Sequence, residues 1–239
     1  MSHSAGHSRP GQLTLHPVTV ASGPLRLIAR HISPVTGSGG DIFGVAPTAD
    51  GVRLIIGDVM GHGAAAHGTA AAVLRAWRLL APEEPALGGI AHRLHSLIAR
   101  SPHPEQYVTA ILGTIGTDAR AELLCCGHPP PLVVRGSSAV FANVLTPALP
   151  LGLLDLADGR LTTHTMPFAP ADRLLFYTDG VTEARSPLGL DFPLAESAAS
   201  HPTEDPGSHL TRIESDLLRH TGGHLNDDAL LLLLEHRRA

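Results

Sequence analysis

Aromatic residues are scarce in this chain of 239 residues, where phenylalanine, tyrosine and tryptophan together make up 3%. Proteins that bind single-stranded nucleic acid stack the bases on exposed aromatic rings, so this scarcity argues against such a surface. Runs of lysine or arginine are also missing, and the formal net charge is −5. Neither a nucleic acid nor an anionic membrane is therefore an expected partner.

Cysteines and long apolar runs are equally scarce. The two cysteines, Cys125 and Cys126, are neighbours, and a disulfide between neighbours would strain the peptide that joins them. We expect both thiols to be reduced, which favours a cytoplasmic location. The N-terminus shows no signal-peptide pattern, and apolar runs such as 229–234 are too short to cross a bilayer.

Histidine, by contrast, occurs 16 times. Most of these residues are scattered singly. His62 and His67 are five positions apart, whereas two ligands on one helix face would need a spacing of four. The histidines are therefore interpreted as surface or packing residues, and not as ligands of a metal site.

Hydrophobic residues make up 43% of the chain, enough for a sizeable core. Alternating apolar patterns predict strands at 13–20, 25–33, 41–47, 52–58, 107–115, 121–126, 132–135, 140–144, 162–166, 173–177 and 229–235. Helical spacing predicts helices at 62–81, 85–100 and 209–220, and a short helix within 188–200; Pro82 is expected to end the first. This order predicts one α+β domain with mostly antiparallel sheets at 23–239, after a flexible N-terminal tail at 1–22.

Asp58 lies in the segment 57–63 (GDVMGHG), where a strand ends and a helix begins. Asp41 opens the preceding strand, and the turn at 49–51 joins the two strands into a hairpin. In a hairpin, the start of the first strand lies beside the end of the second. The pattern therefore predicts that Asp41 and Asp58 meet at one end of a sheet.

Other carboxylates also stand at strand ends, namely Asp179 after strand 173–177 and the pair Asp227-Asp228 before the last strand. Each one alone is equally well explained as a turn or helix-cap residue. Together they would repel one another unless a cation neutralised them. Mg²⁺ and Mn²⁺ prefer such oxygen ligands, and two of these ions about 3.5–4 Å apart would activate water against a phosphate ester.

Five segments, in this order, resemble motifs of the SpoIIE-like bacterial branch of the metal-dependent (PPM, type 2C) serine/threonine protein phosphatases. They are Ser38–Asp41, Gly57–Gly63, Cys126–Pro130, Leu174–Arg185 and Asn226–Asp228. The resemblance covers about residues 24–236. It implies an α/β/β/α sandwich of two mostly antiparallel sheets flanked by helix pairs, with a two-metal site between the sheets at one edge.

The resemblance also implies roles for particular residues. Asp58 would bridge two Mn²⁺ or Mg²⁺ ions, with the backbone carbonyl of Val59 as a further ligand. Asp41 would serve the second ion, directly or through water, and Asp179 and Asp227 would bind the first. Residues expected just outside the ligands are Gly40, Gly57, Gly180 and Asp228.

Two further residues carry open alternatives. His62 is a candidate general acid for the leaving serine oxygen, or else it orients the backbone at the start of the helix. Arg30 is a candidate contact for the substrate phosphate, with a surface salt bridge as the alternative.

The chain departs from the family pattern at three places. Ile42-Phe43-Gly44 stands where an aromatic pair and another acid are usual, Cys125-Cys126 replaces Asn-Ala, and Leu230 occupies a position where a hydroxyl residue is common. None of these departures removes a predicted metal ligand, so we expect activity with altered substrate docking.

The expected function is that of a metal-dependent protein phosphatase that hydrolyses phosphoserine or phosphothreonine by attack of a hydroxide bridging two Mn or Mg ions. The resemblance implies a STAS-type anti-sigma-factor antagonist as the phosphorylated substrate. The alternatives are an inactive phosphoprotein-binding module and a phosphomonoesterase for small molecules. We expect no N-terminal sensor domain within these 239 residues. We therefore expect constitutive activity, or regulation by a partner or self-association through helices 63–81 and 85–100.

Overall fold

The computed structural model describes residues 13–14, 18–33, 39–103, 105–144, 146–158, 160–200 and 205–237. The strands are β1 (Leu13–Thr14), β2 (Val18–Ser22), β3 (Leu25–Ser33), β4 (Asp41–Thr48), β5 (Gly51–Val59), β6 (Val108–Gly116), β7 (Arg120–Cys126), β8 (Leu132–Arg135), β9 (Ser138–Phe141), β10 (His164–Pro167), β11 (Arg173–Tyr177) and β12 (Ala229–His236). The helices are α1 (Gly63–Glu83), α2 (Leu87–Ala99), α3 (Asp179–Thr182), α4 (Leu194–Ser200) and α5 (Pro206–His220), with a 3₁₀ turn at Leu154–Leu156.

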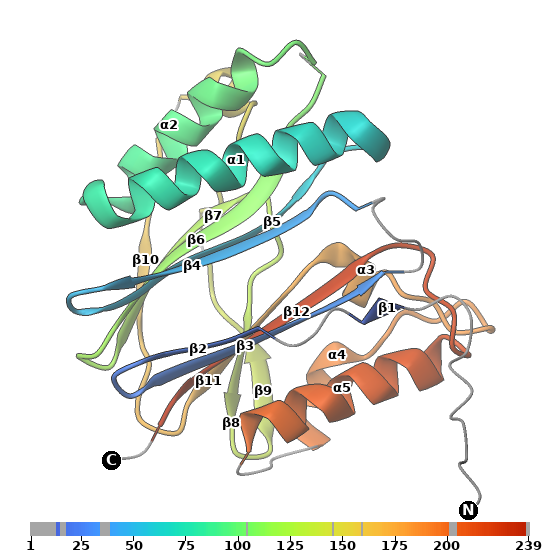
Figure 1. The fold of residues 1–239 in the computed structure, drawn as a ribbon. Coiled ribbons are helices and arrows are strands. Elements are labelled where there is room, and N and C mark those ends of the chain that lie inside the picture. Colours follow the sequence, from blue (N-terminus) through green and yellow to red (C-terminus); the bar gives the residue numbers. More distant parts are fainter. Residues whose placement is uncertain are drawn as a thin grey trace, which may run out of the picture.

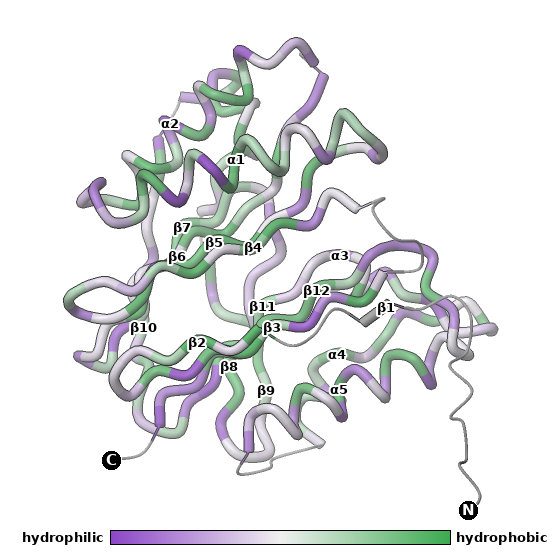
Figure 2. The backbone as a smooth tube through the Cα atoms, in the orientation of Figure 1, coloured by the Kyte–Doolittle hydropathy of each residue, from purple (hydrophilic) through white to green (hydrophobic). Residues whose placement is uncertain are grey.

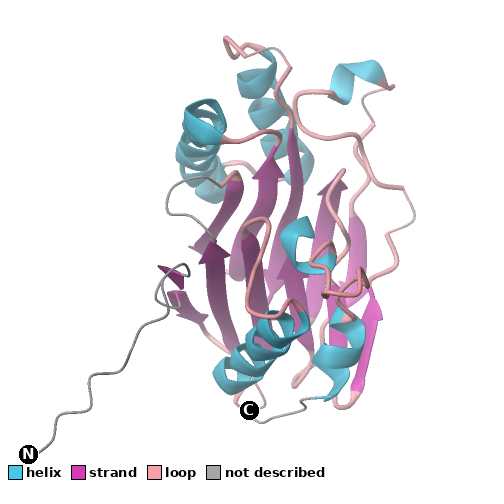
Figure 3. Ribbon diagram, turned by 90° about the vertical axis from the view of Figure 1, so that its right-hand side faces the viewer, coloured by secondary structure: helices cyan, strands magenta, loops and turns pink. Residues whose placement is uncertain are grey.

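These strands form two antiparallel sheets that pack face to face. One sheet has the order β1-β3-β12-β11-β8-β9, with β2 also paired to β3, and the other has the order β10-β7-β6-β5-β4. Helices α1 and α2 cover the outer face of the second sheet, and α4 and α5 cover that of the first (Figure 1). A second view shows the strands at the centre of the molecule with the helices outside them (Figure 3). The predicted α/β/β/α sandwich is confirmed.

Alternation along the strands separates the core into layers. In β3, Leu25, Leu27 and Ala29 face the layer between the two sheets, whereas Ile28 and Ile32 face the helices α4 and α5. A third apolar layer lies under α1 and α2. The hydrophobic segments are concentrated in the central strands (Figure 2), so both sheets are buried on their two faces.

Most predicted elements are present, and the main differences concern three helices. Helix α1 continues through Pro82 to Glu83, because beyond the one hydrogen bond that proline cannot make, the Glu84 N–H still donates to the Leu80 carbonyl at 2.8 Å. Helix α5 begins at Pro206, three residues earlier than predicted, because the Asp205 carboxylate caps it by accepting from the Ser208 N–H at 2.6 Å. Helix α3 was not predicted.

The predicted boundary of the N-terminal tail at residue 22 is wrong, because Val18–Ser22 pairs with β3 as strand β2. Residues 1–12 of that tail lie outside the described residues. Cys125 and Cys126 are free and buried, as predicted, and burial raises the pKa of the two thiols to about 11 and about 12. In the described part of the chain, no helix combines the length and the apolar character needed to cross a membrane.

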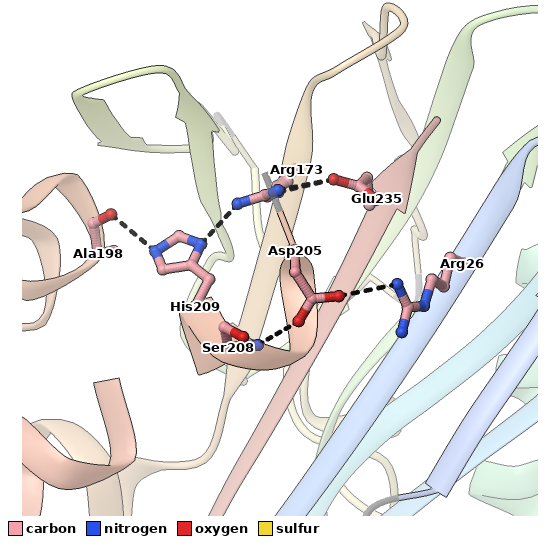
Figure 4. A network of polar contacts seen from close by, with 7 residues as sticks. All are labelled: Arg26, Arg173, Ala198, Asp205, Ser208, His209 and Glu235. Carbon is pink, nitrogen blue, oxygen red and sulfur yellow. Dashed lines mark hydrogen bonds and ion pairs between the residues drawn. The ribbon is translucent and has the colours of Figure 1, made fainter. Parts of the chain in front are cut away.

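A buried polar network anchors α4 and α5 to the sheet beneath them (Figure 4). Arg173 on β11 pairs with Glu235 on β12 at 2.8 Å and also donates to Nδ1 of His209 at 3.0 Å. His209, at the start of α5, donates through Nε2 to the carbonyl of Ala198 at the end of α4 at 3.0 Å. This chain of contacts fixes both helices against the seven-stranded sheet.

Candidate metal centre and active site

The β4–β5 hairpin places Asp41 directly opposite Asp58. The register pairs the two residues at the end of the ladder, with Thr48 opposite Gly51 at the turn. The Val59 N–H donates to the Gly40 carbonyl at 3.1 Å, which continues the pairing beyond the two acids. The hairpin geometry predicted from the sequence is therefore present.

The remaining acids arrive from the other sheet. Asp179 is the first residue of α3 and follows β11 after Thr178, and Asp227 and Asp228 precede β12. Because β11 and β12 are antiparallel neighbours, the end of one strand lies beside the start of the other. A cavity of about 500 Å³ collects all of these side chains. Its lining residues are Gly39, Gly40, Asp41, Asp58, Gly61, His62, Asp179, Asn226, Asp227 and Asp228.

The carboxylates in this cavity interact unfavourably with one another. Burial, followed by the charges of Asp179 and Asp227, raises the pKa of Asp58 to about 7. Burial and the charge of Asp58 also raise the pKa of Asp41 well above its usual range. No lysine or arginine belongs to the cavity lining, so the described protein groups leave this negative charge uncompensated.

Thr178 is a site residue that the sequence reasoning missed. Its side chain is fully buried, and its hydroxyl donates to Asp41 Oδ2 at 3.0 Å while accepting from the Leu230 N–H at 3.0 Å. Thr178 ends the β11 segment, whereas Asp41 belongs to the other sheet. One hydroxyl group therefore ties the two sheets together at the acidic cavity.

His128 forms a second tie between the sheets. Its Nε2 donates to the Tyr177 carbonyl at 3.0 Å, so Nδ1 is the acceptor for the Thr109 hydroxyl at 3.0 Å. Thr109 lies opposite Asp58 in the β5–β6 ladder. Burial lowers the pKa of His128 to about 4, so the imidazole is neutral near pH 7. The Gly-His-Pro segment thus links the strand of Asp58 to the strand that ends at Asp179.

Several glycines are needed because other groups approach their backbone closely. A Cβ at Gly40 would lie 2.5 Å from the Val59 carbonyl oxygen and 2.7 Å from Asp58 Oδ1. A Cβ at Gly180 would collide with the Asp228 carbonyl, and one at Gly57 with the Thr109 carbonyl. Gly40 therefore leaves room for two oxygens that are predicted metal ligands.

His62 lines the acidic cavity but makes no side-chain hydrogen bond to the start of α1, where it is the N-cap residue. Its side chain is exposed. As the N-cap residue with extended backbone, His62 can orient the start of α1 through its backbone, and this alternative also stays a prediction. A role in proton transfer remains a prediction.

Arg30 does not line the cavity, and its predicted phosphate contact is corrected. Its guanidinium pairs with Glu214 on α5 at 2.7 Å and donates to the Thr211 hydroxyl at 2.8 Å. The reason is strand alternation, because Arg30 shares the helix-facing side of β3 with Ile28 and Ile32. The structure therefore shows Arg30 in the salt bridge that was the alternative.

The pair at 227–228 divides into an exposed and a buried carboxylate. Asp227 is exposed and accepts from the Asp228 N–H through Oδ1 at 2.8 Å. Asp228 is 5% exposed, and Ser33 donates to its Oδ1. Its Oδ2 is buried without a hydrogen-bond partner, an arrangement that a neighbouring cation would satisfy.

The donor set fits a hard divalent cation, since it consists of carboxylates and a backbone carbonyl. Among the described residues, no three carboxylate, imidazole or thiol groups already converge as a ready-made ligand cluster. Asp179 and Asp227 are exposed and carry side chains that can turn inward. Ion binding would therefore draw together side chains that their own repulsion keeps apart.

Comparison with known proteins agrees with this architecture. The family model described as Stage II sporulation protein E (SpoIIE) matches residues 48–237. The structure of the RsbU and RsbW domains of a Mycobacterium tuberculosis protein is 27% identical, with a TM-score of 0.70, and the match covers 84% of this chain and 56% of that one.

Two further structures show the same fold at lower identity. The PP2C phosphatase domain of SpoIIE from Bacillus subtilis, solved with a fragment of its regulatory domain, is 20% identical with a TM-score of 0.77, over 88% of this chain and 63% of that one. RsbX in complex with magnesium is 16% identical with a TM-score of 0.68, and the match covers 92% of this chain and 98% of that one. This chain thus spans 56% and 63% of the length of the first two proteins. With the fold of the PP2C phosphatases and a family match over most of its length, the chain belongs to the SpoIIE family.

Proposed function

We propose that this chain is a metal-dependent phosphatase that removes phosphate from phosphoserine or phosphothreonine in a protein. The observation that carries the proposal is the single cavity in which Asp41 and Asp58 from one sheet meet Asp179 and Asp227 from the other. Family membership supports the same reaction class.

Two Mn²⁺ or Mg²⁺ ions would be held by Asp41, Asp58, Asp179, Asp227 and the carbonyl of Val59. When bound, such ions supply Lewis-acid chemistry, because they lower the pKa of water and neutralise phosphoryl charge. The metal ions would be the main positive charges facing the substrate phosphate, because the described cavity lining contains no lysine or arginine.

The protein's own groups prepare the site for this chemistry. Thr178 and His128 fix the strands that carry the ligands, so the carboxylates need little backbone rearrangement. Gly39 lets the Asp228 carboxylate pack against its backbone, and Gly40 does the same for the Val59 carbonyl and Asp58, because a Cβ at either glycine would collide with these groups. His62, an exposed residue of the cavity lining, would be the candidate to give a proton to the leaving oxygen.

We propose a phosphorylated regulatory protein as the substrate, with a STAS-type anti-sigma-factor antagonist as the leading candidate, and a cytoplasmic setting. Support comes from the relatives, since one structure combines RsbU and RsbW domains and another belongs to a study of the bacterial stressosome. Helices α1 and α2 are the proposed surface for a regulator or a second copy, because α1 follows directly on the Asp58 segment.

The test is Mn²⁺-dependent hydrolysis of p-nitrophenyl phosphate and of a phosphorylated STAS protein. Asp58→Ala and Asp179→Ala should abolish both activities while the circular dichroism spectrum stays unchanged. Asp50→Ala is the matched control, because this exposed residue lies in the turn at the other end of the same hairpin. Full activity in purified Asp58→Ala or Asp179→Ala protein would refute the proposal.

A further inference from the structure

A second cavity, of about 670 Å³, opens beside the acidic one and shares Gly39 and Asp41 with it. The rest of its lining comes mainly from β2, β3, β4 and α1. Strand β4 is the last strand of the five-stranded sheet, and no described strand pairs with its outer edge. We call this cavity the edge slot. Figure 1 shows its setting, with α1 on one side of β4 and β2–β3 on the other.

Both side walls of the edge slot are largely apolar. The α1 wall is built from one helical stripe that includes Ala71, Leu74 and Trp77. The opposite wall includes Val18 and Val20 of β2. A strand added along β4 would point successive side chains alternately at these two walls. The edge slot therefore suits an extended segment with apolar side chains on both faces.

The back of the slot is made by the bare backbone of β4 at Gly44. A Cβ at this position would lie 2.6 Å from the Trp77 ring, so only glycine lets the indole pack here. Trp77 is 1% exposed, and its Nε1 has no hydrogen-bond partner. This packing fixes the α1 wall against the edge strand.

Charge also distinguishes the edge slot from the acidic cavity. Apart from Asp41 at the shared end, its titratable lining residues are basic, namely His31, His67 and Arg78. Arg78 is exposed and lies eleven residues after His67, which is about 16 Å farther along α1. Burial lowers the pKa of His31, so Arg78 is the positive charge of this slot, complementary to an acidic residue in a bound segment.

We propose that the edge slot binds the polypeptide segment that flanks the phosphorylated residue of the substrate, as a strand added to the edge of β4. The proposal rests on the proposed function, because the shared Asp41 then marks the position of the phosphorylated residue. From Asp41 to Val45 the slot offers four residue steps, or about 13 Å. The preferred substrate therefore carries apolar residues within four positions of its phosphorylated residue and an acidic residue beyond them, toward Arg78.

The first test compares two phosphopeptides as substrates. Both are nonapeptides with a central phosphoserine and glutamate at each end, and one has valine at the six remaining positions where the other has threonine. Valine and threonine have the same shape and both favour extended backbone, so only the apolar character differs. We expect kcat/KM to be at least tenfold higher for the valine peptide.

The second test measures occupancy without turnover. Trp77 is the only tryptophan, so its emission reports on the edge slot. Non-phosphorylated valine peptide, added to the wild type in Mg²⁺, should shift this emission with a saturable dependence. Ala71→Phe, at an exposed position in the slot wall, should weaken that binding at least tenfold, whereas Ala86→Phe, at an exposed position on α2's N-terminal side, should not.

These tests separate the slot from the reaction. Equal kcat/KM for the two peptides in an active enzyme would overturn the edge slot and leave the phosphatase activity standing. If neither peptide is hydrolysed, but the valine peptide binds saturably and Ala71→Phe weakens this binding, the proposed function is refuted and the edge slot is supported. Trp77 emission that does not respond to the valine peptide would also overturn the proposal.

Discussion

The neutral buried imidazole of His128 makes a pH-dependent contribution to stability that can be calculated. Burial holds the pKa of His128 near 4, whereas the same group titrates near 6.5 when unfolded. As the pH falls, the unfolded state takes up the proton first, so this residue makes the folded protein less stable. Between about pH 7.5 and about pH 5, linkage gives a loss of about 2 kcal/mol.

The test compares the wild type with His128→Gln, both free of metal. At pH 7.5 the variant should be less stable by about 1–3 kcal/mol, because the contacts with Thr109 and Tyr177 are disturbed. At pH 5 this difference should shrink by about 2 kcal/mol, because glutamine does not titrate. Other titrating groups, Asp41 and Asp58 included, are present in both proteins and cancel in the difference.

Urea unfolding followed by the emission of Trp77 provides the measurement, since this single tryptophan is buried in the folded state. A stability difference that stays constant from pH 7.5 to pH 5 would show that His128 titrates normally. It would refute the buried, neutral tie between the strands of Asp58 and Asp179.

Three further predictions concern two residues of the site and Arg30, which lies outside it. Thr178→Val should weaken Mn²⁺ binding severalfold and lower the free energy of unfolding by about 1–3 kcal/mol, because Asp41 loses its donor; Thr178→Ser should restore both in calorimetry and urea unfolding. Gly40→Ala should prevent Mn²⁺ binding in calorimetry, because its Cβ would stand 2.5 Å from the Val59 carbonyl, and wild-type affinity would contradict this. Arg30→Ala should keep the wild-type kcat/KM for p-nitrophenyl phosphate while lowering the free energy of unfolding by about 1–2 kcal/mol, because the salt bridge with Glu214 is lost. A large loss of kcat would instead indicate that Arg30 contacts the substrate.

Local pattern was enough to predict the hairpin half of the candidate site. The turn at 49–51 fixes the register of β4 and β5, and an antiparallel register determines which residues face each other. Asp41 and Asp58 therefore follow from a short stretch of sequence. The strand-end pattern also indicated Asp179 and Asp227, but the sandwich and the ligand role of each acid depended on the family resemblance, because no local signal tells which strands of two sheets meet.

Contacts between the sheets could not be predicted in this way. Thr178 and Asp41 are 137 positions apart, and a threonine before an aspartate reads equally well as a turn residue. The Gly-His-Pro segment is part of the family resemblance, but the sequence does not show the partners of His128. These partners, Thr109 and Tyr177, lie on β6 and β11, which belong to different sheets.

Two local rules in the sequence bear on Arg30 and on the start of α5. The alternation that buries Leu25 and Leu27 between the sheets puts Arg30 on the opposite face of β3, away from the acids. Asp205 followed by Pro206 is a capping residue before a proline at the first helical position, which marks the true start of α5. The first rule favours the salt bridge that was the alternative for Arg30. The second rule predicts that α5 begins at Pro206 and not at His209.

Calorimetric titration with Mn²⁺ tests most directly whether acids from the two sheets build one metal centre. The account predicts two ions per chain for the wild type and for Asp50→Ala, and loss of this binding in Asp58→Ala. Absence of Mn²⁺ binding to the wild type, or unchanged binding in Asp58→Ala, would contradict it.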